Sequence, residues 1–191
     1  AALPALPRLI DLAGDPPERS GRLALYRAQE LWAAGLATDD DRGRARRRLA
    51  ARYAVPSLVA ALEPADWEDA EAGLLDWIAT AESLLQHIAL PRVETRLAAA
   101  RAQLDRAAAA TDERARATAL LLAGAELVET TPRFLARALA AEADVAVRDA
   151  RARAPDPEDP DLLRAARLKD WAARAVEEDD HLVAIQRAYY A

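Results

Sequence analysis

Apolar residues recur every three or four positions along most of the chain, between short polar or proline-containing breaks. This spacing is typical of amphipathic helices, whereas the β-branched residues that favour strands are sparse. One uninterrupted stripe consists of Val93, Leu97, Ala100, Leu104 and Ala107. The pattern predicts an all-α protein, built as an antiparallel helical bundle or a short helical-hairpin array of about seven to eight helices.

The breaks predict where helices begin and end. Asp15–Glu18 and Asp39–Asp41 place acids at helix starts, and Thr131–Pro132 supplies an N-cap followed by proline. Val55–Pro56 is predicted to end a helix, because a residue before proline avoids the α region. The segment 154–160, with prolines at three of its seven positions, is predicted to be a linker.

The length fits one domain covering 1–191, or alternatively two small domains. Hydrophobic residues make up 52% of the 191 residues but aromatics only 5%, so the core must be mainly alanine, leucine and valine. No apolar stretch is long enough to span a bilayer. The small-residue start, Ala1–Ala5, without an initiator methionine, favours an exported protein, although an excised domain would look the same.

Two tryptophan–histidine segments suggest an internal duplication. In both segments an Asp-Trp pair precedes Ala-x-Ala. His87 lies ten residues after Trp77, and His181 lies ten residues after Trp171. Four further matches in the same order favour halves of 6–89 and 90–191. The alternative is that helices rich in alanine, arginine and leucine resemble one another by chance.

The last predicted helix, through Leu182, Ile185 and Tyr189, carries a weaker similarity. Its sequence Asp-His-Leu-Val-Ala-Ile, with Tyr189 and small residues after it, resembles the second helix of a tetratricopeptide repeat. Asp179 stands where that family usually has a small residue, and no 34-residue period appears elsewhere. The resemblance implies a helical hairpin at the end of the chain.

The net charge and the local arginine run point to different partners. A net charge of −6 argues against a dedicated nucleic-acid binder. Six arginines nevertheless lie between Arg42 and Arg52, and on a helix Arg44, Arg48 and Arg52 share one side. This run indicates either an anion or phosphate contact or a solvated face paired with nearby acids.

Metal chemistry has one candidate, Glu178 with His181, whose i, i+3 spacing is that of di-iron helical bundles. Such a site needs a second pair, and Leu84 occupies the matching position before His87. The alternative is that Glu177–Asp180 caps a helix. The absence of cysteine excludes thiolate ligands and cysteine nucleophiles. No glycine-rich phosphate loop or Gly-x-Ser-x-Gly turn occurs.

The four tryptophans, Trp32, Trp67, Trp77 and Trp171, lie among apolar residues and are expected mainly to pack in the core. We expect a helical interaction or adaptor module that binds a protein or peptide and needs no cofactor. The first alternative is a small-ligand carrier with a Trp-lined pocket between helices, and the second is a metal-dependent enzyme using His181, Glu178 and His87. The candidate ligand-binding residues are Trp77, His87, Trp171, His181 and Arg48.

Overall fold

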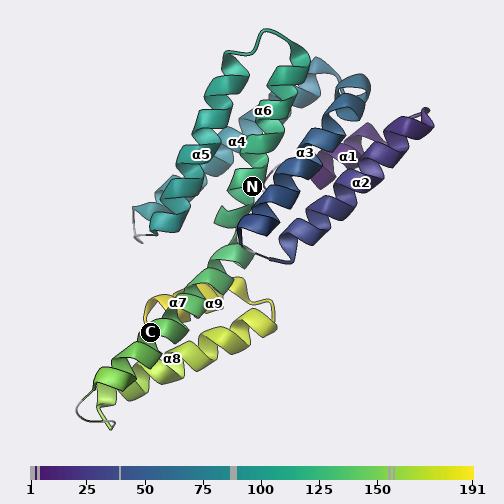
Figure 1. Ribbon diagram of the computed structural model, residues 1–191. Coiled ribbons are helices and arrows are strands. Elements are labelled where there is room, and N and C mark those ends of the chain that lie inside the picture. The colour runs from purple at the N-terminus through teal and green to yellow at the C-terminus, as the bar shows by residue number, and fades with distance from the viewer. Residues whose placement is uncertain (1–2, 4, 39, 87–89, 155, 157) are drawn as a thin grey trace. The chain divides into compact units, whose positions relative to one another are not determined.

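The computed structural model describes residues 3, 5–38, 40–86, 90–154, 156 and 158–191, without the side chain at position 84. These residues hold α-helices, a single 3₁₀ turn and no strand (Figure 1), which confirms the all-α class. The elements are α1 (Leu6–Ala13), α2 (Arg19–Leu36), α3 (Asp41–Ala61), α4 (Pro64–Leu85), α5 (Pro91–Ala108), α6 (Glu113–Leu127), η1 (Val128–Thr130), α7 (Pro132–Arg153), α8 (Pro160–Glu177) and α9 (His181–Tyr189).

The described residues form nine α-helices, so the predicted count of seven to eight was wrong. The short helix α1 was not predicted, and Pro56 does not end a helix but lies inside α3. Its ring is exposed, whereas Ala54, Val55 and Leu58 around it are at most 2% exposed. Burial of this continuous apolar face offsets the cost of an interior proline, about 3 kcal/mol.

The chain divides into two compact units, Ala1–Thr130 and Thr131–Ala191. We refer to them as the N-terminal unit and the C-terminal unit and describe each by itself. The boundary between the proposed duplicated halves, 89/90, falls inside the N-terminal unit. The duplication is therefore not confirmed and remains a hypothesis.

The N-terminal unit has two layers of helices (Figure 1). Helices α2, α3, α6 and α5 lie side by side in this order, and α1 and α4 cover one face of that layer. All five residues of the stripe predicted on α5 are buried, at most 8% exposed. Asp40 and Asp112 cap α3 and α6 by accepting hydrogen bonds from the backbone N–H of Gly43 and Ala115, each at 2.8 Å.

Two glycines allow α2 and α3 to approach closely. A Cβ added at Gly35 would lie 2.8 Å from the Gly43 carbonyl oxygen and 2.7 Å from the side chain of Arg47. A Cβ at Gly43 would lie 2.4 Å from the Thr38 carbonyl oxygen. Only glycine fits at either position without displacing the backbone.

The C-terminal unit consists of α7, α8 and α9, and each of them packs against the other two. The predicted linker lies between α7 and α8, and α8 begins with Pro160. Alanine fills much of the interface, because a small side chain lets helix backbones lie close together. The buried alanines include Ala166, Ala172, Ala175, Ala184 and Ala188, at most 7% exposed.

Candidate functional site

A groove along α8 in the C-terminal unit combines an exposed aromatic ring with several arginines. Its volume is about 550 Å³. It is lined by Pro160, Leu163, Arg164, Arg167, Leu168, Trp171 and Arg187. The first six recur at three- and four-residue intervals and so share one side of α8, while Arg187 comes from α9. At 1.5 Å per residue, these positions extend over about 16 Å, or three helical turns.

Trp171 is the aromatic part of this groove, and its side chain is not in the core as the sequence led us to expect. It is 47% exposed, whereas Trp32 and Trp67 are 3% and 2% exposed. The neighbouring residues Leu168, Ala172 and Ala175 form the buried face of α8. Trp171 lies at the edge of this face. The guanidinium of Arg187 lies over its ring, 5.3 Å from the centroid.

The arginines of the groove make no ion pair with a carboxylate in the described part of the chain. No described carboxylate oxygen lies within 4 Å of a guanidinium nitrogen of Arg164, Arg167 or Arg187. Lys169 differs, because its ammonium contacts Asp170 at 3.0 Å and Asp144 at 3.2 Å. Hydrogen bonds to these two carboxylates raise the pKa of Lys169 above its ordinary value. Asp144 and Asp170 thus pair with Lys169.

His181 and Glu178 lie at the turn between α8 and α9, and the structure gives this turn a capping role. The side chain of Asp180 accepts a hydrogen bond from the Val183 N–H at 3.3 Å, which confirms the predicted N-cap. Asp179 adopts a left-handed conformation with φ of 58°, a conformation that aspartate tolerates at helix ends. The Asp180 N–H reaches back to the Ala175 carbonyl at 2.9 Å and closes the end of α8.

The metal hypothesis gains no support from this geometry. The nearest ion-pair contact of His181 is between its Nε2 and an Asp179 carboxylate oxygen at 3.9 Å. Among the residues that the structure describes, no group of three or more histidine, aspartate or glutamate side chains could hold a metal ion. His87 lies outside the described residues.

Trp77 and Trp171 have different surroundings. In the N-terminal unit, Trp77 is half-buried on α4, and its indole N–H donates a hydrogen bond to the Thr130 hydroxyl at 2.8 Å. Trp171 has an arginine over its ring instead. Trp77 and Arg48 belong to one unit and Trp171 and His181 to the other. The difference between the two rings gives no support to equivalent tryptophan–histidine sites.

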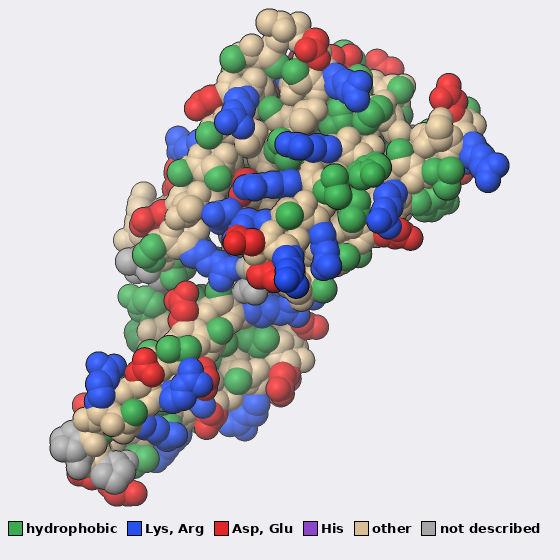
Figure 2. Space-filling model, in the orientation of Figure 1, with side chains coloured by type: hydrophobic (Ala, Val, Ile, Leu, Met, Phe, Trp, Pro, Cys, Tyr) green, Lys and Arg blue, Asp and Glu red, His purple; other side chains and the backbone are tan. Residues whose placement is uncertain are grey.

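Arg48 belongs to a cluster of charged side chains in the N-terminal unit, between α3, α5 and α6. Figure 2 shows arginine side chains gathered over these helices. Arg48 contacts the Glu126 carboxylate at 2.5 Å, and Arg96 contacts its other oxygen at 2.8 Å. Glu129 pairs with Arg44 at 2.8 Å and with Arg47 at 2.5 Å.

The centre of this cluster is buried. The side chains of Arg47 and Glu129 are both 0% exposed, and Arg47 also donates to the Gly35 carbonyl at 2.6 Å. Burial lowers the pKa of Arg47 and outweighs the attraction of Glu129. For Arg44, burial also favours loss of the proton, but hydrogen bonds to Glu129 and Asp41 prevail and raise the pKa.

The sequence prediction missed Arg47, Glu126 and Glu129. The sequence did contain one indication of these glutamates. Glu126 interrupts the apolar run 119–128, and Glu129 follows it directly. A carboxylate in a buried helix needs a cationic partner, and the arginine run of α3 was the richest source. The alternative prediction was a solvated arginine face paired with nearby acids. Arg44 does pair with Asp41, but Arg44 and Arg48 also pair with the buried Glu129 and Glu126, so this face is only partly solvated.

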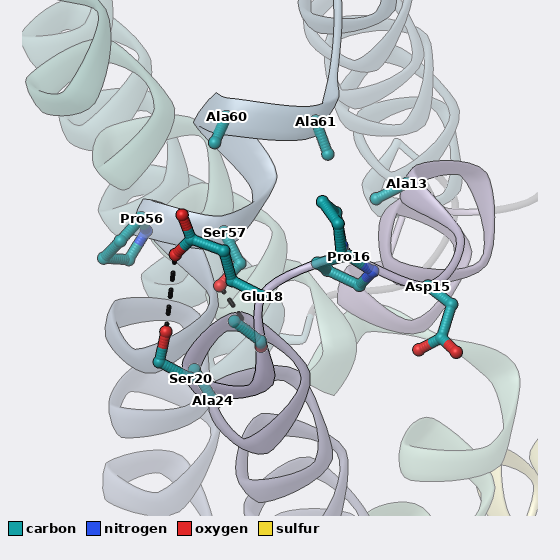
Figure 3. Close-up of a pocket in the computed structure, with 12 residues that line it drawn as sticks. Ala13, Asp15, Pro16, Glu18, Ser20, Ala24, Pro56, Ser57, Ala60 and Ala61 are labelled. Carbon is teal, nitrogen blue, oxygen red and sulfur yellow. Dashed lines mark hydrogen bonds between the residues drawn. The ribbon is translucent and has the colours of Figure 1, made fainter.

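The N-terminal unit also has a hollow of about 660 Å³ between the α1–α2 connection and the second half of α3. Figure 3 shows that short side chains border it, with Ala60 and Ala61 on one side and Pro16 and Pro56 on others. Asp15 points away from the hollow in this view. None of the residues predicted as a site lines it.

The chain matches no protein-family model, no curated protein and no solved structure. In the described residues, no helix combines the length and the apolar character needed to cross a membrane.

Proposed function

We propose that this protein is a helical interaction module that binds an acidic peptide segment of a protein partner along α8. The observation that carries the proposal is the groove with Arg164, Arg167 and Arg187 beside a half-exposed Trp171. Tryptophan and arginine are the residues in which binding energy concentrates at protein interfaces. The positive charge in an otherwise acidic chain selects a partner of negative charge.

The shape of the groove favours a peptide over a compact small molecule. Its lining residues extend along about three turns of α8, which matches the length of a short helix laid into a groove. Such a peptide would place apolar side chains against Leu163, Leu168 and Trp171, and its carboxylates would pair with the arginines. Paired carboxylate–arginine contacts are strong and directional.

Two synthetic amphipathic peptides test the proposal. Both carry the same leucine and alanine face, but the polar face is glutamate in one and lysine in the other. We expect the glutamate peptide to bind, with an affinity that falls as sodium chloride is raised, since salt screens exposed charges. Fluorescence anisotropy of labelled peptide measures both affinities. Equal binding of the two peptides would contradict the proposal.

Substitution of Trp171 locates the binding. We expect Trp171→Ala to lower the affinity for the glutamate peptide about tenfold, because a central aromatic anchor is lost. Leu182→Ala is the matched control, since Leu182 is 73% exposed on α9 but does not line the groove. If both variants bind like the unmodified protein, the peptide does not use this groove. A saturable shift of Trp171 emission by a small aromatic acid alone would instead favour the small-ligand carrier.

A further inference from the structure

The hollow between the α1–α2 connection and the second half of α3 is bordered mainly by short side chains. Eight of its twelve lining residues are alanine, glycine or proline, namely Ala13, Pro16, Pro17, Gly21, Ala24, Pro56, Ala60 and Ala61. Its volume of about 660 Å³ lies within the range of about 300–1,000 Å³ that is usual for small-molecule sites. The short side chains therefore leave room for a small ligand beside an otherwise closely packed helix layer.

The walls of this hollow are held in place by the fold. Pro16 and Pro17 restrict the backbone of the connection. One terminal nitrogen of Arg22 donates to the carbonyl oxygens of both prolines, each at 2.8 Å. On the opposite wall Ser57 is only 8% exposed, and its hydroxyl donates to the Gly21 carbonyl at 3.3 Å, which links α3 to α2. A site whose walls are already ordered loses less entropy when a ligand binds.

The charged residues that line the hollow are both acidic. Asp15 points away from it in Figure 3, whereas the Glu18 side chain extends toward Pro56. No arginine or lysine is among the lining residues, and Arg22 borders a neighbouring hollow instead. The charge at this place therefore favours a cation over an anion.

The polar groups of the hollow are free mainly as hydrogen-bond acceptors. The Glu18 carboxylate accepts one long hydrogen bond, from the Ser20 hydroxyl at 3.5 Å, and its side chain does not cap α2. It makes no ion pair in the described part of the chain. The Ser57 hydroxyl uses its proton on the Gly21 carbonyl, so only its oxygen lone pairs remain. An alkylammonium group, which has three donors and no acceptor, complements such a set.

We infer that this hollow binds a small primary arylalkylamine in its protonated form. The aromatic ring packs against the proline rings and alanine methyl groups, since proline and aromatic surfaces fit one another. The ammonium group contacts the Glu18 carboxylate. A single exposed carboxylate attracts an ammonium only weakly, so the apolar walls supply most of the affinity. The site is independent of the groove on α8, which selects the opposite charge.

Three probes with the same aromatic body test the class of ligand. They are 2-phenylethylamine, the uncharged 2-phenylethanol and the anionic 3-phenylpropanoate, each titrated at neutral pH and equal ionic strength. We expect saturable binding of the amine by calorimetry, weaker binding of the alcohol and the weakest binding of the carboxylate. Equal affinity for the three probes, or no saturable binding of the amine, would overturn the inference.

Ala60→Leu locates the binding, because Ala60 is exposed on α3 and a larger side chain there takes up part of the hollow (Figure 3). We expect about tenfold weaker binding of the amine. Ala45→Leu is the matched control, since Ala45 is also exposed on α3 but does not line the hollow. Unchanged affinity in Ala60→Leu would show that the amine binds elsewhere and would overturn the assignment.

Glu18→Gln keeps the side-chain size but removes the charge. We expect the amine to bind about threefold more weakly, with no change for the alcohol. Glu30→Gln is the control, because it removes the same charge from a residue of α2 that is 69% exposed and does not line the hollow. Equal loss in both variants would reduce the effect to net charge and contradict the role of Glu18. Trp171→Ala is expected to leave amine binding unchanged, which separates this site from the peptide groove.

Discussion

Both units contain a group of arginines, but the surroundings of the two groups differ. In the N-terminal unit, Arg44, Arg47 and Arg48 pair with Glu126 of α6 and Glu129 of η1, which are far away in the sequence. In the C-terminal unit, the groove arginines have an indole ring and apolar side chains beside them instead of carboxylates.

This difference shows that the role of an arginine depends on whether the fold brings an acid to it. Where a buried glutamate is present, the arginines pair with it and hold helices together. Where the arginines make no such ion pair, their charge can contribute to the choice of a partner. The three groove arginines are therefore better candidates for partner recognition than the denser run in α3.

The largest effect is expected from removing the acid that Arg47 depends on. Glu129→Gln keeps the side-chain size but removes the carboxylate charge with which the fully buried Arg47 guanidinium pairs. Breaking one partner of a buried pair costs about 3–5 kcal/mol. Urea unfolding measures this loss through Trp32, Trp67 and Trp77, in a Trp171→Phe background that removes the tryptophan signal of the C-terminal unit.

Glu71→Gln is the control for that experiment. Glu71 of α4, like Glu129, pairs with an arginine: it contacts Arg116 of α6 at 2.7 Å. Unlike Glu129, the Glu71 side chain is 27% exposed. A partly exposed pair contributes about 0–1 kcal/mol. Similar losses for the two glutamine variants would mean that Glu129 is not the centre of the cluster.

The next largest effect concerns the close approach that places Arg47. In Gly35→Ala, the added methyl group would meet the Arg47 side chain and the Gly43 carbonyl oxygen. Overpacking costs about 1–3 kcal/mol and exceeds the helix-propensity gain of about 1 kcal/mol. The same urea assay measures the change.

Gly21→Ala serves as the comparison on the same helix, because its nearest neighbour is a Pro16 side-chain carbon at 3.2 Å. We expect it to destabilise less than Gly35→Ala. If Gly35→Ala instead raises the free energy of unfolding, α2 and α3 do not depend on this glycine.

The smallest effect is expected from removing a helix cap, and the two units provide one cap each for comparison. Asp40 accepts from Gly43 N–H at 2.8 Å, and Asp180 accepts from Val183 N–H at 3.3 Å. Asp40→Ala is therefore expected to lower the unfolding temperature of its unit more than Asp180→Ala lowers that of the other.

The cap of α3 should also depend on pH. The hydrogen bond from the Gly43 N–H, followed by that from the Thr38 hydroxyl, lowers the pKa of Asp40 below 3.8. A carboxyl whose pKa is lower in the folded state stabilises the fold above pH 3.8, and the contribution disappears as pH falls through the folded pKa. The advantage of the unmodified protein over Asp40→Ala should thus shrink in acid. A constant difference down to the lowest pH would contradict this account.

Local features could be predicted from the sequence because they depend on neighbouring residues. The apolar stripe of α5, the caps Asp40 and Asp180 and the linker before Pro160 depend only on spacing and nearby side chains. Continuity of α3 through Pro56 was missed, because it depends on burial against other helices.

The two sites depended more strongly on the tertiary fold. Arg47 and Glu129 are 82 residues apart, and no local pattern specifies their pairing. The exposure of Trp171 depends on which side of α8 the alanine-rich interface takes. Arg48 and Trp171 were identified as candidates, but the residues around them came only from the fold.

The proposed role of the groove is tested most directly by reversing its charge. In the double variant Arg164→Glu with Arg167→Glu, two of the groove's three positive charges become negative, while Trp171 and the apolar lining remain. Fluorescence anisotropy with the glutamate and lysine peptides then compares the preferences of the two proteins. We predict that the variant binds the lysine peptide and loses the glutamate peptide. An unchanged preference for the glutamate peptide would contradict recognition by this groove.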